Sequence, residues 1–596
     1  MNRRKVLRLA TAMPFLSGLG LPGLAEAQAR RRSRPADAAW PSASDWQRLK
    51  EDVGGNLIDV PPLFVACETA PSGAACIDAL EHIANPYWLG DQPAGTELSG
   101  GLDAWSPSPS AYAVQAQIAA HVAAAVNFAR EHDLRLVVKG GGHSYLGTSN
   151  APDSLLVWTR DMNAVALHDS IVPRGCEDQL APVPAVSMGS GAVWMDLYTA
   201  VTTRAGRYVQ GGGCTTVGVA GLVQSGGFGS FSKRFGPSAA GMLEAEVVTA
   251  DGRIRVVNAC NDADLFWALK GGGGGTFAVV TRATLRMHHL PRLFGAVGGA
   301  IQARSGAAFA RLIARFVDFY RDNLFNSNWG EQIRVSPDDT LEIAMVCQGL
   351  DGNEMRQTWQ PFFDWVRARP EDFTVSAPFA AGASSARDWW RVEGNPSMIP
   401  DTRESARRDR GWWEGDQAQV GAFVHGYDSV WLPESLLVAA RSASLARALF
   451  AASRHQRVEL HFNKGLAGAP ADVLAAARGT AMNPDAIDAF ALAIVAAGEA
   501  PAYPGLSRAP IDFAAARRNA RDVDAAAAEL RKLAPSAGSY VSESSYFNPD
   551  WQRAYWGSHY ERLRAVKAEY DPDGLFIVHH GVGSEDWSAD GFTYIR

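Results

Sequence analysis

The segment KGGGHSY at residues 139–145 is the most informative stretch of this sequence, and it follows an apolar run at 134–138 that predicts a buried strand. Three successive glycines let backbone N–H groups turn toward one point and let another molecule approach the chain closely. Such a turn can cradle a phosphate or a pyrophosphate. His143 ends the turn, where its imidazole could act as a nucleophile or could be a hydrogen-bonded core group.

Two further glycine-rich segments lie downstream. The first, GGGCTTVG at 211–218, places Cys214 after three glycines, so its backbone could be pressed against a flat ring while its sulfur stays accessible. A structural cysteine in a flexible loop is the alternative. The second, DADLFWALKG at 262–271, predicts a helix that is followed directly by a glycine run ending at Gly275.

The periodicity of apolar residues predicts the elements around these glycines. Helices are expected at 115–131, 192–205 and 262–270, and strands at 134–138, 244–250, 253–257 and 277–287, with a hairpin turn at Asp251-Gly252. Helices and strands are mixed without regular βαβ spacing. This pattern favours an α+β fold over a doubly wound parallel sheet.

The length of 596 residues predicts several packed units, and the composition argues for a folded protein and against a mostly disordered one. The net charge is −7 and the body of the chain has no long basic block, which argues against a nucleic-acid partner. The 58 glycines and 18 tryptophans indicate a ligand site with aromatic walls.

Composition divides the chain into segments. We expect a wrapping N-terminal extension at 30–104, a first domain at 105–290, a second domain at 291–535 and a C-terminal segment at 536–596. The second domain carries alanine-rich helical stretches at 436–453 and 524–533 and the tryptophan pairs 389–390 and 412–413. These tryptophans either belong to the core or line a sugar or aromatic pocket. The second domain carries no readable signature of its substrate.

Residues 1–29 resemble an export signal of the twin-arginine type, because Arg3-Arg4 precedes an apolar stretch that ends in Ala27-Gln28-Ala29. An ordinary secretory signal is the alternative. The sequence therefore predicts a periplasmic or secreted protein that meets the Tat export machinery. No later run is long and apolar enough to span a bilayer, so no membrane association is expected.

Six cysteines are present, and their contexts differ. Cys67 and Cys76 are close together in a loop-like stretch, so a local disulfide between them is plausible in an oxidising compartment. Cys260 and Cys347 read as small buried apolar residues.

The three glycine-rich segments, in this order and at these separations, resemble the FAD-linked oxidases of the berberine bridge enzyme type, with the vanillyl-alcohol-oxidase-like fold. The resemblance covers 122–287, and a matching tail runs from Tyr540-Val541-Ser542-Glu543 through 555–563 to Phe576. It implies an α+β, two-subdomain FAD-binding domain at 105–290 of the PCMH type. It also implies a substrate domain with an antiparallel sheet covered by helices.

The resemblance also implies the cofactor site. In the family, a histidine bonds to the flavin 8α-methyl carbon, and many members add a cysteine bond to flavin C6; the matching positions are His143 and Cys214. Further FAD contacts are expected from Lys139, Gly140, Gly141, Gly142, Ser144, Tyr145, Gly212, Gly213, Val217, Gly218, Gly221 and Val279. No metal is expected, because His579-His580 with Glu585-Asp586 matches no standard zinc or iron spacing.

The activity implied is transfer of a hydride from a hydroxyl-bearing carbon to FAD, with O2 reduced to H2O2. Val217 matches a family position where a small residue leaves room for dioxygen, which favours an oxidase over a dehydrogenase with a quinone or cytochrome acceptor. The transfer needs a base for the hydroxyl proton, and Tyr540 is the first candidate and Glu543 the second. A catalytically idle flavin-binding or carbohydrate-binding protein is the alternative from another class.

Overall fold

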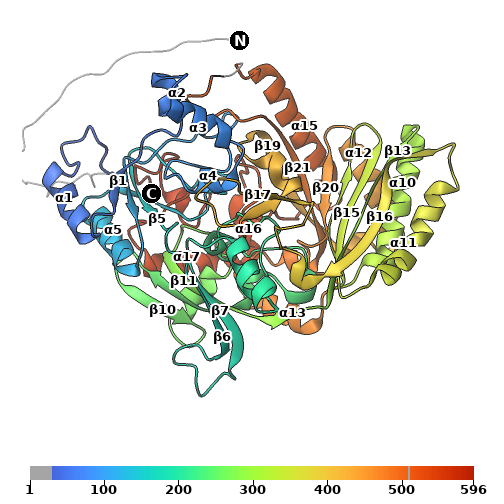
Figure 1. Ribbon diagram of the computed structural model, residues 1–596, viewed down its shortest axis with the longest axis horizontal. Coiled ribbons are helices and arrows are strands. Elements are labelled where there is room, and N and C mark those ends of the chain that lie inside the picture. The colour runs from blue at the N-terminus through green and yellow to red at the C-terminus, as the bar shows by residue number, and fades with distance from the viewer. Residues whose placement is uncertain (1–29, 508–509) are drawn as a thin grey trace, which may run out of the picture.

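Three sheets organise the chain, and each buries a face against helices. The computed structural model describes residues 30–507 and 510–596, so the export signal expected at 1–29 lies outside the described residues. In Figure 1 the two smaller sheets lie on the left with both ends of the described chain, and the largest sheet lies on the right. The mixed architecture confirms the α+β class.

The first sheet surrounds a short parallel unit. Its order is β1-β3-β5-β4, with bounds Leu57–Asp59 (β1), Tyr112–Gln115 (β3), Ser154–Trp158 (β5) and Arg135–Lys139 (β4). Strands β3, β5 and β4 are parallel, and helix α5 (Ala119–Glu131) crosses between β3 and β4. The helix expected at 115–131 starts four residues later because Gln115 ends β3. One βαβ unit is therefore present, although the sequence suggested no such spacing.

The second sheet is antiparallel, with the order β10-β9-β11-β7-β6. The bounds are Val165–Ile171 (β6), Val183–Gly189 (β7), Met242–Val248 (β9), Ile254–Asn258 (β10) and Val279–Arg286 (β11). Strands β9 and β10 pair as the expected hairpin. The expected helices appear as α9 (Ala263–Leu269) and as α6 (Trp194–Leu197), which continues as a π-helical stretch at Tyr198–Arg204.

The third sheet has eight strands in the order β16-β13-β15-β14-β20-β21-β19-β2. The bounds are Gly100–Gly101 (β2), Leu293–Ala303 (β13), Trp329–Val335 (β14), Thr340–Gln348 (β15), Phe373–Ser385 (β16), Phe423–Pro433 (β19), Val458–His461 (β20) and Ala489–Glu499 (β21). All neighbours are antiparallel except β2 and β19. This confirms the antiparallel sheet that the resemblance implied.

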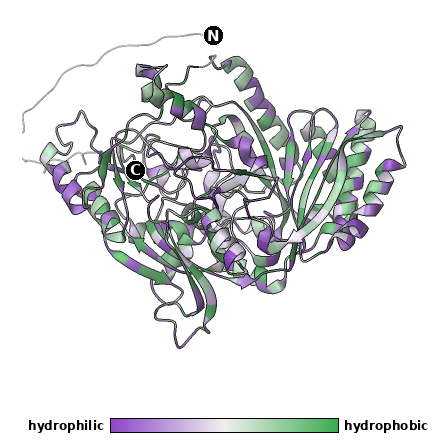
Figure 2. Ribbon diagram, viewed as in Figure 1, coloured by the Kyte–Doolittle hydropathy of each residue, from purple (hydrophilic) through white to green (hydrophobic). Residues whose placement is uncertain are grey.

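Four helices cover one face of the third sheet. They are α10 (Gly306–Phe319), α11 (Gly352–Arg367), α12 (Ala439–Ser453) and α15 (Phe513–Arg531). Side chains such as Phe316, Trp359 and Leu449 fill the core between helices and strands. Figure 2 shows apolar residues along the strands and polar ones on the outer sides of these helices, as expected for amphipathic helices. The other face of the third sheet borders the cavity described below.

The N-terminal extension at 30–104 is more ordered than the sequence suggested. It forms α1 (Ala43–Asp52), α2 (Val65–Thr69), α3 (Ala74–His82) and α4 (Pro86–Gly90). Its strand β1 joins the first sheet and its strand β2 joins the third. These elements are too short to show a period in the sequence. Through β1 and β2 the extension bridges the first half of the molecule, which contains the first and second sheets, and the second half, which contains the third sheet.

The C-terminal segment returns to the first half of the molecule. This segment contains the helices α16 (Trp551–Trp556) and α17 (Tyr560–Tyr570), and α17 packs against α9 of the first half. The buried Lys567 ammonium donates to the carbonyl oxygens of Thr276 and Phe576, each at 2.6 Å, and pairs with Asp571. None of the helices in residues 30–507 and 510–596 combines the length and apolarity that a membrane span requires.

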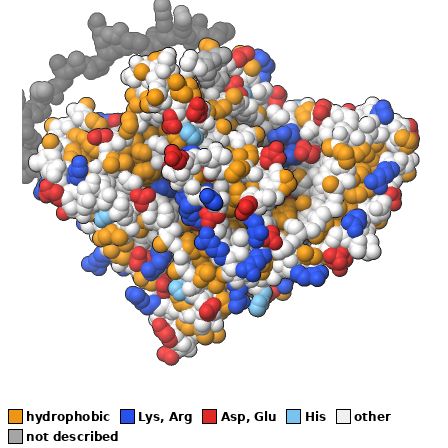
Figure 3. Space-filling view, viewed as in Figure 1, with side chains coloured by type: hydrophobic (Ala, Val, Ile, Leu, Met, Phe, Trp, Pro, Cys, Tyr) orange, Lys and Arg blue, Asp and Glu red, His pale blue; other side chains and the backbone are white. Residues whose placement is uncertain are grey.

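A second buried lysine joins the two halves. Lys233 lies in α8 (Ser232–Phe235), and its ammonium donates to the carbonyl oxygens of Gly465, Ala467 and Phe490 at 2.6–3.0 Å. Buried carbonyl groups are costly when they lack a donor, so this contact fixes the third sheet against the first half. On the face in Figure 3, acidic and basic side chains are interspersed over both halves.

Two disulfides fasten the chain. Cys67–Cys76 links α2 to α3, which confirms the expected local bridge. The expectation that Cys260 is a buried apolar residue is wrong, because it pairs with Cys176 across a Cα separation of 5.7 Å. The two cysteines are 84 residues apart, so the sequence did not predict this pair; the β9–β10 hairpin brings Cys260 next to Cys176. Cys347 is buried, as expected.

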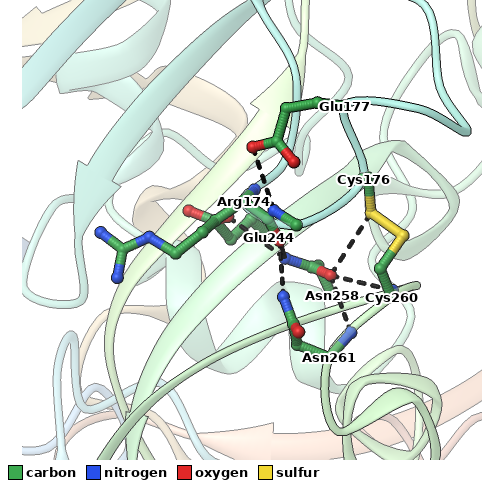
Figure 4. Close-up of a disulfide and its surroundings, with 8 residues drawn as sticks. Arg174, Cys176, Glu177, Glu244, Asn258, Cys260 and Asn261 are labelled. Atoms are coloured by element: carbon green, nitrogen blue, oxygen red, sulfur yellow. Dashed lines mark hydrogen bonds between the residues drawn. A yellow bond between two sulfur atoms is a disulfide. The ribbon is translucent and has the colours of Figure 1, made fainter.

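Figure 4 shows why Cys260 meets Cys176. The side-chain oxygen of Asn258 accepts from the backbone N–H of Cys260 at 2.9 Å, and its amide donates to the carbonyl of Arg174. Asn261 donates to the same carbonyl. The end of β10 is thereby held against the loop after β6, with both sulfurs between them.

The two disulfides predict different losses of stability. The Cys176→Ser/Cys260→Ser variant opens a far longer loop than Cys67→Ser/Cys76→Ser, with sequence separations of 84 and 9. Chain entropy alone then makes the first loss larger by about 2 kcal/mol. Urea unfolding of both variants and of wild type measures this difference. Equal losses would contradict an entropic origin.

Candidate active site

A cavity of about 900 Å³ lies between the first half and the free face of the third sheet. Its size is at the upper end of the range of about 300–1,000 Å³ for ligand sites. Its walls come from residues 138–149, 208–231, 273–280, the strands of the third sheet and the C-terminal residues 540–543 and 578–581. All the glycine-rich segments singled out in the sequence therefore reach one cavity.

Two glycine turns touch each other at the cavity wall. A Cβ added to Gly141 would lie 2.7 Å from the nitrogen of Gly218, and one added to Gly218 would lie 2.8 Å from the nitrogen of Gly141. No side chain fits at either position, since both obstacles are backbone atoms. The segment 215–219 is fixed from the other side by bonds to residues 192–195. This contact brings the turn of His143 and the loop of Cys214 together.

His143 faces the cavity next to a buried carboxylate. Its Nε2 lies 3.7 Å from Oε2 of Glu97, which follows α4 in the N-terminal extension. Burial and the charge of Arg160 lower the pKa of His143 to about 4, although contact with the Thr216 backbone opposes the shift. Burial and the charge of Asp416 raise the pKa of Glu97 to about 8. The imidazole is therefore neutral at pH 7, the form in which a ring nitrogen is nucleophilic.

Cys214 lies half-buried at the cavity wall as a free thiol. Burial, the charge of Asp416 and contact with its carboxylate raise the pKa of this thiol well above its usual value, and the charge of Lys464 opposes the shift. Burial raises the pKa of Asp416 to about 6. The sulfur is accessible, as expected, but it is protonated at neutral pH.

The remaining expected cofactor residues lie around the same cavity, with one exception. Those at its wall are Gly140, Gly141, Gly142, Ser144, Tyr145, Gly212, Gly213, Val217, Gly218, Gly221 and Lys139. The Lys139 ammonium donates to the carbonyls of Gln92, Pro93 and Gly95, so it holds the N-terminal extension. The exception is Val279, which is buried in the core beneath the first sheet, whereas Ala278 and Val280 line the cavity.

The two candidate bases both reach the cavity. The Tyr540 hydroxyl is buried and has no hydrogen-bond partner among residues 30–507 and 510–596. Burial and the charge of Glu543 raise its pKa. Glu543 itself is paired with Lys464, whose ammonium lies 2.6 Å from Oε1. The phenol oxygen is thus available to a ligand, whereas the carboxylate is already neutralised.

The third sheet adds charged residues that the sequence analysis did not single out. Strand β20 alternates Val458 and Leu460 toward the core with Glu459 and His461 toward the cavity. Burial raises the pKa of Glu459, but His461 and two arginines outweigh it and lower it to about 2. Glu331 in β14 also lines the cavity and has a φ of 62°, which is uncommon for a residue with a side chain. The alternation of apolar and charged residues in β20 is the sequence signal that could have predicted these charged cavity residues.

Both tryptophan pairs contribute to the cavity and to the core. Trp389, Trp390 and Trp413 line the cavity, and the Trp389 and Trp413 ring centroids are 6.0 Å apart. Trp412 is buried with Trp390 in the core of the first half. Trp412 is therefore a core residue, Trp389 and Trp413 line the cavity, and Trp390 belongs to both.

Several buried polar groups of residues that line the cavity lack hydrogen-bond partners. Six buried polar atoms of residues that line it have no hydrogen-bond partner among the described residues: Ser190 Oγ, Gln224 Oε1, Arg334 Nε, Asp416 Oδ2, Asn463 Oδ1 and Tyr540 Oη. Buried polar groups without partners are uncommon, and each carries a desolvation penalty. Together with the glycine turns, which leave backbone exposed to a flat ligand, they fit a large polar cofactor and a substrate.

Comparisons with known proteins agree with this geometry. Residues 110–258 match the family model of the FAD binding domain, and residues 518–583 match that of berberine and berberine-like proteins. The VAO-type flavoprotein oxidase VAO615 of Thermothelomyces thermophilus is 28% identical, over 94% of this chain and 94% of its own.

Solved structures give the same result. The VAO-type flavoprotein MtVAO615 from Myceliophthora thermophila C1 has a TM-score of 0.77 and 25% identity, covering 94% of this chain and 99% of its own. A glucooligosaccharide oxidase from Acremonium strictum with a 6-S-cysteinyl, 8α-N1-histidyl FAD shares the fold, with a TM-score of 0.59 and 18% identity over 81% of this chain and 94% of its own.

The fold and the glycine-walled cavity define a flavin-dependent oxidoreductase. More particularly, parts of the chain match the FAD binding domain and the berberine-like family, and nearly its whole length is similar to VAO-type flavoprotein oxidases, which confirms the resemblance seen in the sequence.

The contact between the glycine turns predicts a matched pair of variants. Gly141→Ala places a methyl group against the Gly218 backbone, so it should destabilise the protein by about 1–3 kcal/mol and reduce the FAD bound per chain. Gly382→Ala, in strand β16 and away from the cavity, meets no atom within 4 Å and should leave both quantities unchanged. Absorbance ratios and thermal melting measure the two effects. Equal FAD content in both variants would contradict a cradle at Gly141.

Proposed function

We propose that this protein is an oxidase that takes a hydride from a hydroxyl-bearing carbon of an alcohol, a sugar or a related molecule. FAD, held covalently through both His143 and Cys214, would accept the hydride and pass the electrons to O2, forming H2O2. The observation that carries the proposal is the convergence of both nucleophilic side chains and the unpartnered Tyr540 hydroxyl on one cavity.

The geometry supports two tethers. The imidazole of His143 is neutral and the sulfur of Cys214 is accessible, and the contact between Gly141 and Gly218 fixes their loops side by side. The distant neighbour from Acremonium strictum carries both kinds of bond. Covalent attachment prevents loss of the cofactor and tunes its reactivity.

The double tether predicts a clear pattern of flavin retention. Acid-denatured wild type should stay yellow and carry the mass of one FAD, and His143→Ala and Cys214→Ala should each keep FAD through the other residue. The double variant should release it. Cys347→Ala, which changes a buried cysteine outside the cavity, is the control. Colourless wild-type protein with the mass of its amino acids alone would overturn the proposal.

The substrate would lie between the flavin side of the cavity and the third sheet. Trp389 and Trp413 offer aromatic surfaces for a ring, and the charged residues of β14 and β20 offer hydrogen bonds to hydroxyl groups. Tyr540 is the first candidate to receive the hydroxyl proton because its oxygen has no other partner, and Glu543 is the second. The Glu543–Lys464 pair stands next to it.

Removing the phenol tests this role. Tyr540→Phe should slow the anaerobic bleaching of the flavin by about 10²–10⁴-fold, the usual contribution of a general base. Suitable probes are a benzylic alcohol, glucose and cellobiose, followed by stopped-flow absorbance. Folding should be little affected, since the hydroxyl bonds to no described residue. Tyr112→Phe, in β3 of the first sheet, is the control. An unchanged bleaching rate in Tyr540→Phe would remove Tyr540 from the mechanism.

The electron acceptor distinguishes the proposed oxidase, which uses O2, from a dehydrogenase, which uses a quinone or a cytochrome. Val217 lines the cavity with a small side chain, which supports access of O2 in line with the resemblance. Reduced enzyme mixed with air should then reoxidise quickly, and slow reoxidation would favour a dehydrogenase with a quinone or cytochrome acceptor. If no alcohol, sugar or phenol bleaches the flavin, the protein is a catalytically idle flavin-binding or carbohydrate-binding protein.

We also propose that the protein works in the periplasm or outside the cell, after passage through the Tat machinery. The two disulfides support an oxidising compartment. Covalent FAD suits a protein that cannot replace a lost cofactor.

A further inference from the structure

A carboxylate from the second half of the molecule lies against the thiol of Cys214. Asp416 belongs to a 3-10 helix at Glu414–Gln419, which follows strand β18 (Gly411–Trp413). It contacts the thiol, and its Oδ2 is buried without a hydrogen-bond partner among the described residues. Because both side chains line the cavity, the pair faces the expected position of the flavin.

The fold fixes this pair from both sides. The hydroxyl of Thr215, next to Cys214, donates to the carbonyl of Gly411 at 2.9 Å. The hydroxyl of Tyr145, in the turn of His143, donates to the side chain of Gln419 at 2.8 Å. The segment 411–419 is therefore tied at its start, in β18, to the cysteine loop and at its end, in the short helix, to the histidine turn. Asp416 lies between these two ties, so its position is not accidental.

The thiol needs a partner that can take its proton. Thiols react as thiolates, and burial raises the pKa of Cys214 well above its usual value. Burial also raises the pKa of Asp416 to about 6, which makes it a stronger base than an ordinary aspartate while leaving it mostly ionised at pH 7. Asp416 is thus an ionised base placed to take the thiol proton as the S–C bond forms.

Two other titratable side chains act on Cys214 among the described residues, and neither suits the role of proton acceptor. Glu97, whose pKa is about 8, mostly keeps its own proton at pH 7, and Lys464 is paired with Glu543. Asp416 is the carboxylate in contact with the sulfur.

We propose that Asp416 is the proton acceptor for Cys214 when the sulfur bonds to flavin C6. The S–H bond breaks with its proton going to Asp416, the S–C bond forms with the sulfur's electron pair, and the C6–H bond breaks with its proton passing to water. The flavin is thereby reduced by two electrons, and O2 takes these electrons with two protons and leaves as H2O2. The inference rests on the double tether proposed above, and it assigns that bond a dedicated residue from outside the FAD-binding domain.

Three variants test the inference. Asp416→Asn removes the base but keeps the shape, Asp416→Glu restores a carboxylate, and Glu414→Gln removes an exposed carboxylate from the same short helix. Each protein is purified with its FAD, denatured, alkylated with iodoacetamide and digested. Mass spectrometry then gives the fraction of Cys214 that is alkylated and the fraction of His143 that carries FAD.

The expected result is a selective loss of one bond. In Asp416→Asn most Cys214 should be alkylated while His143 keeps its FAD, which also shows that the variant folds. Asp416→Glu should recover part of the Cys214 bond, and Glu414→Gln should match wild type. A Cys214 that is bonded equally in Asp416→Asn and wild type would overturn the role of Asp416 alone. A Cys214 that is alkylated in wild type would instead overturn the double tether and the inference together.

Discussion

The contact between the backbones of Gly141 and Gly218 is the constraint on which the rest of the site depends. Neither position has room for a Cβ, since each would meet a backbone nitrogen at less than 3 Å. Close packing of two turns without side chains places a histidine and a cysteine, which are 71 residues apart in the numbering, on one wall. It also leaves that part of the wall without side chains at Gly141 and Gly218, so another molecule can approach the backbone closely.

Buried lysines hold the surrounding segments to this wall. Lys139 binds carbonyls of the N-terminal extension, Lys233 binds carbonyls of the substrate half, and Lys567 binds carbonyls near the glycine run and the C-terminal tail. An ammonium group can satisfy several carbonyl groups at once and compensates for part of its own burial. Each lysine thus joins chain segments that no strand pairing connects directly.

Electrostatics gives the cavity two different sides. On the side proposed for the flavin, burial keeps His143 neutral and the thiol of Cys214 protonated, with the carboxyl groups of Glu97 and Asp416 beside them. On the side proposed for the substrate, charges are paired, as in Lys464 with Glu543. Uncharged nucleophiles, with the ionised Asp416 next to Cys214, suit covalent attachment of a cofactor, and paired charges suit recognition of a polar but neutral substrate.

The sequence alone determined the glycine turns, the β9–β10 hairpin and the helices α9 and α12, because each depends on local patterns that a short window contains. It singled out His143, Cys214 and Tyr540 only through the resemblance to a known family, and the structure places all three at one cavity. The tertiary structure alone decided the Cys176–Cys260 disulfide, the inward side of β20, and the positions of Glu97 and Asp416. These features depend on contacts between distant segments, and an acidic residue in a short helix looks the same in a sequence whether it faces water or a thiol.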